Sequence, residues 1–174
     1  MQDNLDEIFG VARLPERIDK WEQGRSPESL CSFDDKTATA LVKLQECVQS
    51  NLLKFDARTK SFLWAIDADG GLTLALEEIA VRPPEAPQAG YARRRGFRHP
   101  VEEKKLGHPT LVGGGKARIA GELAFDENGG SLRWVLNANS GRYCKQLPPT
   151  KTQIDAAANL FKTFGMEVKV DYFI

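Results

Sequence analysis

The stretch RIAGELAFDENGGSLRWVLN, residues 118–137, predicts one β-hairpin. Apolar and polar residues alternate on both sides of Asn128-Gly129, a pair that is favoured in two-residue type I′ turns. Such a turn aligns apolar residues across the two strands, pairing Phe125 with Leu132, Leu123 with Trp134 and Gly121 with Leu136. Turn chemistry and hydrophobic alternation therefore indicate the same register and one shared apolar face.

Two more regular patterns occur upstream of this hairpin. Residues 62–66 and 72–76 are apolar runs that flank an Asp-Gly turn, which predicts a second hairpin. Residues 35–53 predict a helix that Asp34 or Asp35 can cap. Its apolar stripe has helical spacing and consists of Leu41, Leu44, Val48 and Leu52.

Residues 150–173 predict a helix followed by a strand. Thr150 and Gln153 fit a capping box at the start of the helix, and Gly165 suits its C-terminal cap. Residues 168–173 predict a closing strand. The buried face of the helix is expected to contain Ile154, Ala157, Leu160, Phe161 and Phe164.

These elements predict an α+β fold: an antiparallel sheet built from two β-hairpins plus a C-terminal strand, packed by two main helices, with short N-terminal helices. At the N-terminus, residues 5–9 have helical apolar spacing, and Pro15 can occupy the first turn of a helix that runs to Trp21. A length of 174 residues fits one domain. We therefore expect a helical N-terminal segment over residues 1–33 and a single α+β domain over residues 34–174.

The composition excludes several classes of protein. Lysine and arginine balance aspartate and glutamate at 24 each, so net charge provides no global attraction to nucleic acid or to anionic membranes. Three cysteines without CxxC pairing argue against a disulfide scaffold and for a reducing compartment. No apolar stretch approaches the roughly 18 residues of a membrane span. We expect a cytoplasmic protein, although export by a specialised secretion system fits the same composition.

Regular patterning stops in the long basic loop at residues 82–116. A loop of this length inside a compact domain is usually functional or disordered. Within it, Arg93, Arg94 and Arg95 lie between Tyr91 and Phe97. Arginines pair with phosphates while aromatic rings stack on bases, so the pattern fits a phosphate or RNA contact as well as a solvated loop.

Candidate chemical groups lie between residues 93 and 143. His108 is a candidate for fixing a substrate or the loop backbone, and histidine is the natural general base near neutral pH. Glu122 lies mid-strand on the face opposite the apolar residues, where it is either catalytic or a solvent-facing partner of Arg133. A zinc site drawn from His99, His108 and Cys144 has no known ligand spacing, so we expect no metal site.

The exit of the second hairpin strand is rich in groups that can bind a ligand. Asn139, Ser140, Arg142 and Tyr143 lie where loops commonly carry such contacts. The Asn-Ser-Gly sequence is equally good turn chemistry.

Three short motifs occur in order: LGHPTLVGG at residues 106–114, AGEL at residues 120–123 and NSGRY at residues 139–143. Their order and spacing resemble a module of plant IQ-motif calmodulin-binding proteins and of fungal and bacterial relatives. In that module a His-containing segment ending in Gly-Gly leads to Ala-Gly-Glu or Ala-Gly-Arg, and then to Ser-Gly-His-Tyr. The bacterial relatives are large toxin- or effector-like proteins.

This chain departs from the resembling module at two places. Thr110-Leu111 replaces the usual Ser-Phe-Leu-type run, and Arg142 stands where histidine is usual. If that histidine is essential, the resemblance implies an inactive or altered version. No calmodulin-binding IQ pattern is present, so that activity does not carry over.

The preferred hypothesis is a bacterial effector- or toxin-like domain that binds a phosphate-bearing ligand, with NAD-dependent ADP-ribosyl transfer as the reaction class to test. By analogy with such transferases, His108, Glu122 and Tyr143 are the expected catalytic residues. The expected ligand-binding residues are Arg93, Arg94, Arg95, Asn139, Ser140 and Arg142. The competing hypothesis is a non-enzymatic interaction protein, such as an immunity protein, a chaperone or an adaptor. An RNA-binding module is the third.

Overall fold

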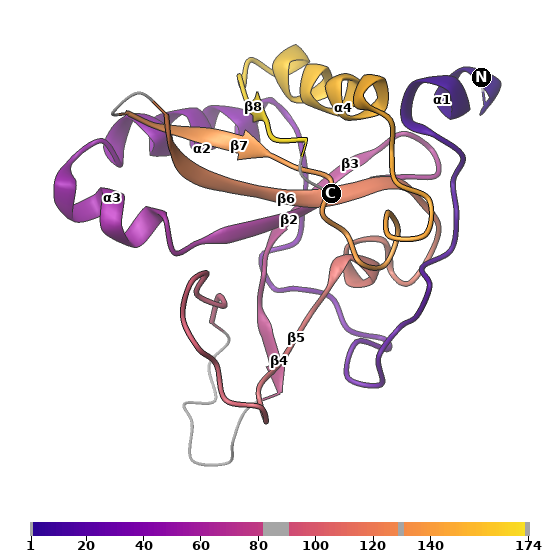
Figure 1. Ribbon diagram of the computed structural model, residues 1–174, viewed down its shortest axis with the longest axis horizontal. Coiled ribbons are helices and arrows are strands. Elements are labelled where there is room, and N and C mark those ends of the chain that lie inside the picture. Colours follow the sequence, from indigo (N-terminus) through magenta and orange to yellow (C-terminus); the bar gives the residue numbers. More distant parts are fainter. Residues whose placement is uncertain (1, 82–90, 129–130, 173–174) are drawn as a thin grey trace.

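The computed structural model describes residues 2–81, 91–128 and 131–172, and its main element is a six-stranded sheet (Figure 1). The strand order is β1-β3-β2-β6-β7-β8. In that order the strands are Cys31–Ser32, Leu72–Leu76, Ser61–Asp67, Ala117–Asn128, Ser131–Leu136 and Lys169–Val170. Helices and strands share one fold, so the expected α+β class is confirmed.

The β6–β7 hairpin forms with the predicted apolar face but in a different register. Phe125 lies opposite Trp134, whereas the expected turn pairs Phe125 with Leu132. The cause is the position of the turn: Asn128 pairs with Ser131, so the connecting residues are 129 and 130, which lie outside the described residues. Moving the turn by one residue shifts each pairing by two, so every side chain keeps its face. The predicted register is therefore wrong, and the predicted face is confirmed.

The sheet is mixed rather than wholly antiparallel. The predicted hairpin upstream is confirmed, because β2 and β3 pair antiparallel. β8, however, pairs in parallel with β7, with Val135 opposite Lys169. The chain between them contains the helix α4, Lys151–Thr163, and such a crossover returns the chain in the same direction. The prediction that every strand is antiparallel is wrong for β8, and Phe173, the last residue of the predicted strand, lies outside the described residues.

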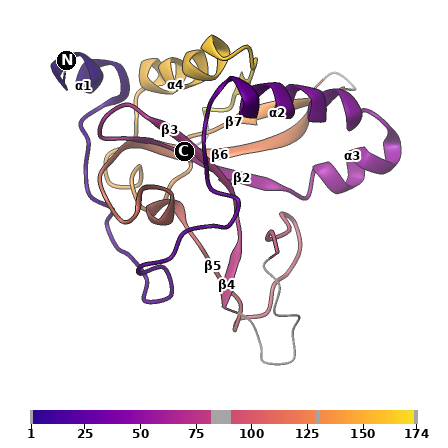
Figure 2. The same cartoon turned by 180° about the vertical axis from the view of Figure 1, so that it is seen from behind.

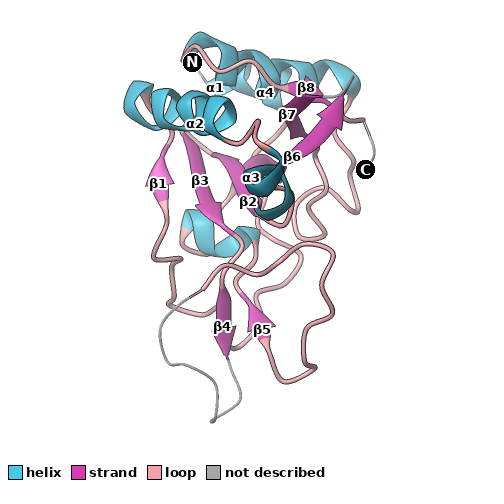
Figure 3. Ribbon diagram, turned by 90° about the vertical axis from the view of Figure 1, so that its left-hand side faces the viewer, coloured by secondary structure: helices cyan, strands magenta, loops and turns pink. Residues whose placement is uncertain are grey.

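Two helices cover one face of the sheet. α2, Asp35–Cys47, and α4 lie together on this face, on the side opposite to β4 and β5 (Figures 2 and 3). The sheet contributes Trp64, whose ring meets that of Phe161 of α4 edge to face at 6.2 Å. Both predicted N-terminal caps are confirmed, since Asp34 accepts a hydrogen bond from Thr37 and Thr150 forms a capping box with Gln153.

The helix predicted over residues 35–53 is divided in two. α2 ends at Cys47, and α3 runs over Asn51–Ala57. Near this break, Gln45 and Gln49 bind the part of β7 that β8 does not pair with. Gln45 accepts a hydrogen bond from the Trp134 backbone, and Gln49 donates one to the Leu132 carbonyl. Leu52 is 83% exposed, so its predicted place in the buried stripe is wrong.

The opposite face of the sheet carries shorter elements. A 3₁₀ helix, η1, runs over His108–Val112, and β4, Ile79–Val81, pairs with β5, Lys104–Lys105. At the N-terminus α1, Gln2–Phe9, is helical, but the helix predicted from Pro15 is wrong. Residues 11–18 contain no helix because their backbone forms hydrogen bonds with distant segments. The backbone N–H of Arg13 donates to the Ala117 carbonyl, and that of Glu16 donates to the Arg142 carbonyl.

Candidate functional site

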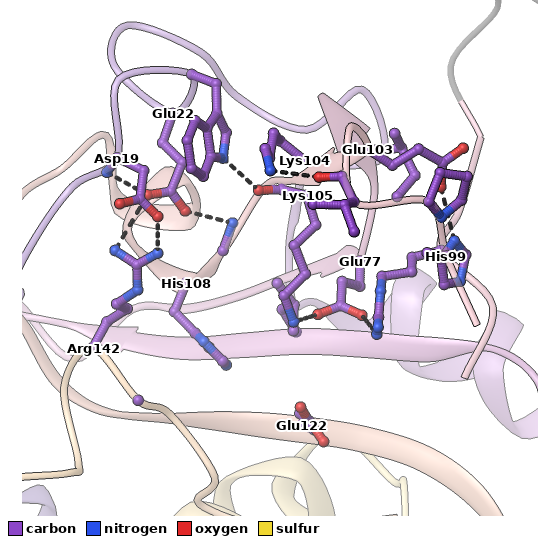
Figure 4. Close-up of a pocket in the computed structure, with 18 of the residues that line it drawn as sticks. Asp19, Glu22, Glu77, His99, Glu103, Lys104, Lys105, His108, Glu122 and Arg142 are labelled. Carbon is purple, nitrogen blue, oxygen red and sulfur yellow. Dashed lines mark hydrogen bonds and ion pairs between the residues drawn. The ribbon is translucent and has the colours of Figure 1, made fainter. Parts of the chain in front are cut away.

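A pocket of about 720 Å³ opens on this second face of the sheet (Figure 4). Its floor consists of Leu63 of β2, Glu122 of β6 and His108 of η1. Its walls are formed by residues 17–22, by β4, by residues 97–101 together with β5, and by the exit of β7 at residues 139–142. The pocket therefore collects charged side chains from most of the chain.

Glu122 is a half-buried carboxyl on the pocket floor. Its place follows from the register, because it pairs with Leu63 and alternates with residues that face the helices. Its backbone N–H donates to Oδ1 of Asn137 at 3.1 Å. Burial raises the pKa of Glu122, and the nearby negative charge of Glu77 raises it further.

His108 is a neutral histidine beside Glu122. Its Nε2 lies 2.9 Å from the carbonyl oxygen of Gly121, which can only accept, so Nε2 carries the proton and Nδ1 is the acceptor of the ring. Burial lowers the pKa of His108 to about 4. At neutral pH this side chain can accept a hydrogen bond but brings no positive charge.

Glu77, directly after β3, holds two cations of the pocket. Its Oε2 accepts a hydrogen bond from Arg93 at 3.1 Å, and its Oε1 contacts Lys105 (Figure 4). Burial alone would raise the pKa of Glu77, but Lys105 and Arg93 together lower it below its ordinary value. Arg93 and Lys105 thus share the charge of one protein carboxylate.

Arg142 ties the exit of β7 to the N-terminal segment. Its guanidinium lies 2.5 Å from Oδ2 of Asp19 and 3.4 Å from Oε2 of Glu22, and it donates to the carbonyl of Arg17 at 2.9 Å. The Glu22 carboxylate also accepts from the Gly107 N–H at 2.9 Å. These contacts hold residues 17–22 as one wall of the pocket.

The structure brings together five of the nine predicted site residues. His108, Glu122, Arg93, Asn139 and Arg142 all line the pocket.

The other four lie elsewhere. Tyr143 is buried, and its hydroxyl donates to the Gly115 carbonyl at 2.8 Å. Ser140 is buried and outside the pocket lining. Arg94 and Arg95 are exposed and outside the lining, with the Arg94 guanidinium 5.7 Å from the centre of the Phe97 ring.

Sequence reasoning missed the carboxylates that organise the pocket. Glu77 and Glu78 end an apolar strand, a signal that could have drawn attention to them. Asp19 and Glu22 carry no comparable signal, because their partner lies more than a hundred residues away. The zinc site considered from His99, His108 and Cys144 does not form, because the Cys144 thiol donates a hydrogen bond to the Ala120 carbonyl. Over residues 2–81, 91–128 and 131–172, no three His, Cys, Asp or Glu side chains are grouped so that they could hold a metal ion.

Comparisons with protein-family models, with curated proteins and with solved structures found no match. The likeness of the three motifs to the module of toxin-like proteins therefore stays a prediction. Within the described part of the chain, no helix has the length and apolar character needed to cross a membrane.

Proposed function

We propose that this chain is an effector- or toxin-like domain whose pocket binds a phosphate-bearing ligand. The observation that supports this is the pocket, whose volume of about 720 Å³ suits a small organic ligand. Arg98 and Lys104 line it, and among the described residues neither has a carboxylate partner. Cations of this kind are suited to the oxygens of a phosphate.

The reaction class proposed for the pocket is NAD-dependent ADP-ribosyl transfer. The bond between nicotinamide and ribose breaks, nicotinamide leaves with the bonding electrons, and a target nucleophile bonds to the ribose carbon and releases a proton. Glu122 stabilises the positive charge that develops on the ribose. His108 accepts a ligand hydrogen bond through Nδ1, whereas the Tyr143 hydroxyl donates to the Gly115 carbonyl and takes no part in the reaction.

A binding and turnover experiment tests this proposal. Purified chain is titrated with NAD by calorimetry, and nicotinamide release is followed in the presence of a bacterial lysate as the source of target. Binding and release are expected for the wild type, and release is expected to disappear in Glu122→Gln. Glu127→Gln is the matched control, since Glu127 lies on the same strand but is exposed and outside the pocket. Absence of NAD binding at millimolar concentration would refute the transferase proposal.

Expression in bacteria tests the effector part of the proposal. Wild type, His108→Ala and Glu122→Gln are expressed at matched soluble levels, and growth is measured. Growth arrest by the wild type alone is expected. Tyr143→Phe should retain toxicity, because its hydroxyl contacts backbone and not the pocket. If no version slows growth, the toxin hypothesis fails and capture of a protein partner becomes the next experiment.

A further inference from the structure

The charges of the pocket are unequally paired. Arg93 and Lys105 are both bound by Glu77, and Arg142 is bound by Asp19 and Glu22. These three cations are already balanced by protein carboxylates. A ligand anion that approached them would have to compete with those contacts.

Among the described carboxylates that line the pocket, Glu122 is the one without such a pairing. It lines the pocket and is half-buried, yet within the described ranges no lysine, arginine or histidine forms an ion pair with it. Glu77 repels its negative charge, whereas Lys105 and Arg95 attract it without forming an ion pair. The Asn137 side chain forms a hydrogen bond with it. A half-buried carboxylate of this kind gains most from a positively charged hydrogen-bond donor.

His108, the second polar group of the pocket floor, also favours a hydrogen-bond donor. His108 directs its proton to the Gly121 carbonyl, so the acceptor Nδ1 is what the ring has left to offer. Since burial keeps this histidine neutral, it does not repel a cation. His108 and Glu122 both line this pocket, and the His108 ring is held by the backbone of the residue that precedes Glu122 on β6.

We propose that Glu122 and His108 form a subsite for a cationic, hydrogen-bond-donating group of the target nucleophile, such as a guanidinium or a primary ammonium. The subsite deepens the proposed function, because it names the chemical class of the target, and it rests on that function for the location of the dinucleotide. The cation of the target lies on the floor. The phosphates of the dinucleotide lie towards Lys104, which in the view of Figure 4 is on the other side of Glu77 from Glu122.

A matched pair of probes tests the cation subsite without knowledge of the natural ligand. Benzamidine, an amidinium cation, and benzamide, its neutral counterpart, are titrated into the full chain and followed by NMR chemical shifts. Wild type is expected to bind benzamidine at least about tenfold more tightly than benzamide. The preference should vanish in Glu122→Gln and persist in Glu127→Gln. Equal affinity of the wild type for the two probes, or an unchanged preference in Glu122→Gln, would overturn the proposal.

A pH series on the wild type guards against a variant that fails to fold. Protonation of Glu122 removes its charge, so benzamidine binding should weaken as pH is lowered while benzamide binding stays constant. A preference that does not change with pH would contradict the subsite. ADP-ribose is titrated separately and tests whether the pocket binds phosphates. If ADP-ribose does not bind while the preference for benzamidine persists, the proposed function is refuted and the cation subsite is retained.

Discussion

At the scale of single residues, His108 makes stability depend on pH. In the unfolded chain its pKa is near the ordinary value of 6.5, and in the folded chain burial lowers the pKa to about 4. Between these values the unfolded state binds a proton that the folded state does not, so the free energy of unfolding falls as pH falls through this window. Above pH 6.5 both states are neutral, and this contribution is constant.

We therefore predict that His108→Gln flattens the acid side of the stability profile. Urea unfolding of wild type and variant from pH 6.5 to pH 4 should show that the wild type loses more stability, by at most about 3 kcal/mol. Glutamine retains a donor for the Gly121 carbonyl, so the variant is expected to fold. Parallel profiles for the two proteins would show that His108 is not the residue that titrates.

A second prediction at this scale concerns Arg142. Replacing it by methionine leaves the Glu22 carboxylate, which is 1% exposed, without its cation. Loss of one partner from a buried pair costs about 3 kcal/mol, and urea unfolding should show a decrease of that order. Arg17→Met is the control, because the Arg17 side chain is 71% exposed and its pair with Asp19 should contribute almost nothing. Similar small losses in both variants would contradict a structural role for Arg142.

At the scale of elements, β6 allows no side chain at position 121. A Cβ there would lie 1.9 Å from the Asn137 carbonyl oxygen, where the backbone after β7 crosses close to β6. This close approach also places Asn137 beside the Glu122 backbone. The glycine of the Ala-Gly-Glu motif thus has a packing reason that is separate from any ligand.

We predict that Gly121→Ala destabilises the fold by about 3 kcal/mol or more, since backbone must move to admit the methyl group. Thermal and urea unfolding measure this loss. Gly141→Ala is the matched control, because a Cβ at position 141 would meet no atom within 4 Å. Equal stability of the two variants would mean that the strands separate easily at this point.

At the scale of the whole molecule, the N-terminal segment is tied into the sheet by a buried cation. The Arg118 side chain of β6 is fully buried, and it contacts Asp6 of α1 and donates to the carbonyls of Gly10 and Ala68. The following residues 17–22 then form a wall of the pocket. Deleting residues 1–33 would therefore remove a wall of the pocket together with the N-terminal helix. Such a truncation does not distinguish an effector-like domain from a non-enzymatic interaction protein.

We predict that Asp6→Ala loosens this connection. The buried Arg118 would keep its carbonyl partners but lose its counter-charge, which should cost about 3 kcal/mol in urea unfolding and make residues 1–12 more sensitive to limited proteolysis. Glu7→Ala changes the neighbouring, exposed residue of the same helix and should change neither measurement. Unchanged proteolysis in Asp6→Ala would show that packing of α1 on α4 is sufficient.

Local patterns in the sequence were enough to predict the α+β class, both hairpins and the caps at Asp34 and Thr150, because alternation, turn residues and capping side chains act between near neighbours. They also directed attention to His108 and Glu122. The tertiary structure alone decided the parallel pairing of β8, the break after Cys47 and the place of Tyr143.

The charge pairing of the pocket was likewise decided only in three dimensions. Arg142 and Asp19 are separated by 123 positions and Gly107 and Glu22 by 85, and no local pattern records such pairs. An ion pair depends on the distance between atoms and not on spacing along the chain. The sequence by itself therefore determined the elements, and the packing of distant segments determined which charges of the pocket are paired and which, Glu122 among them, have no ion-pair partner within the described residues.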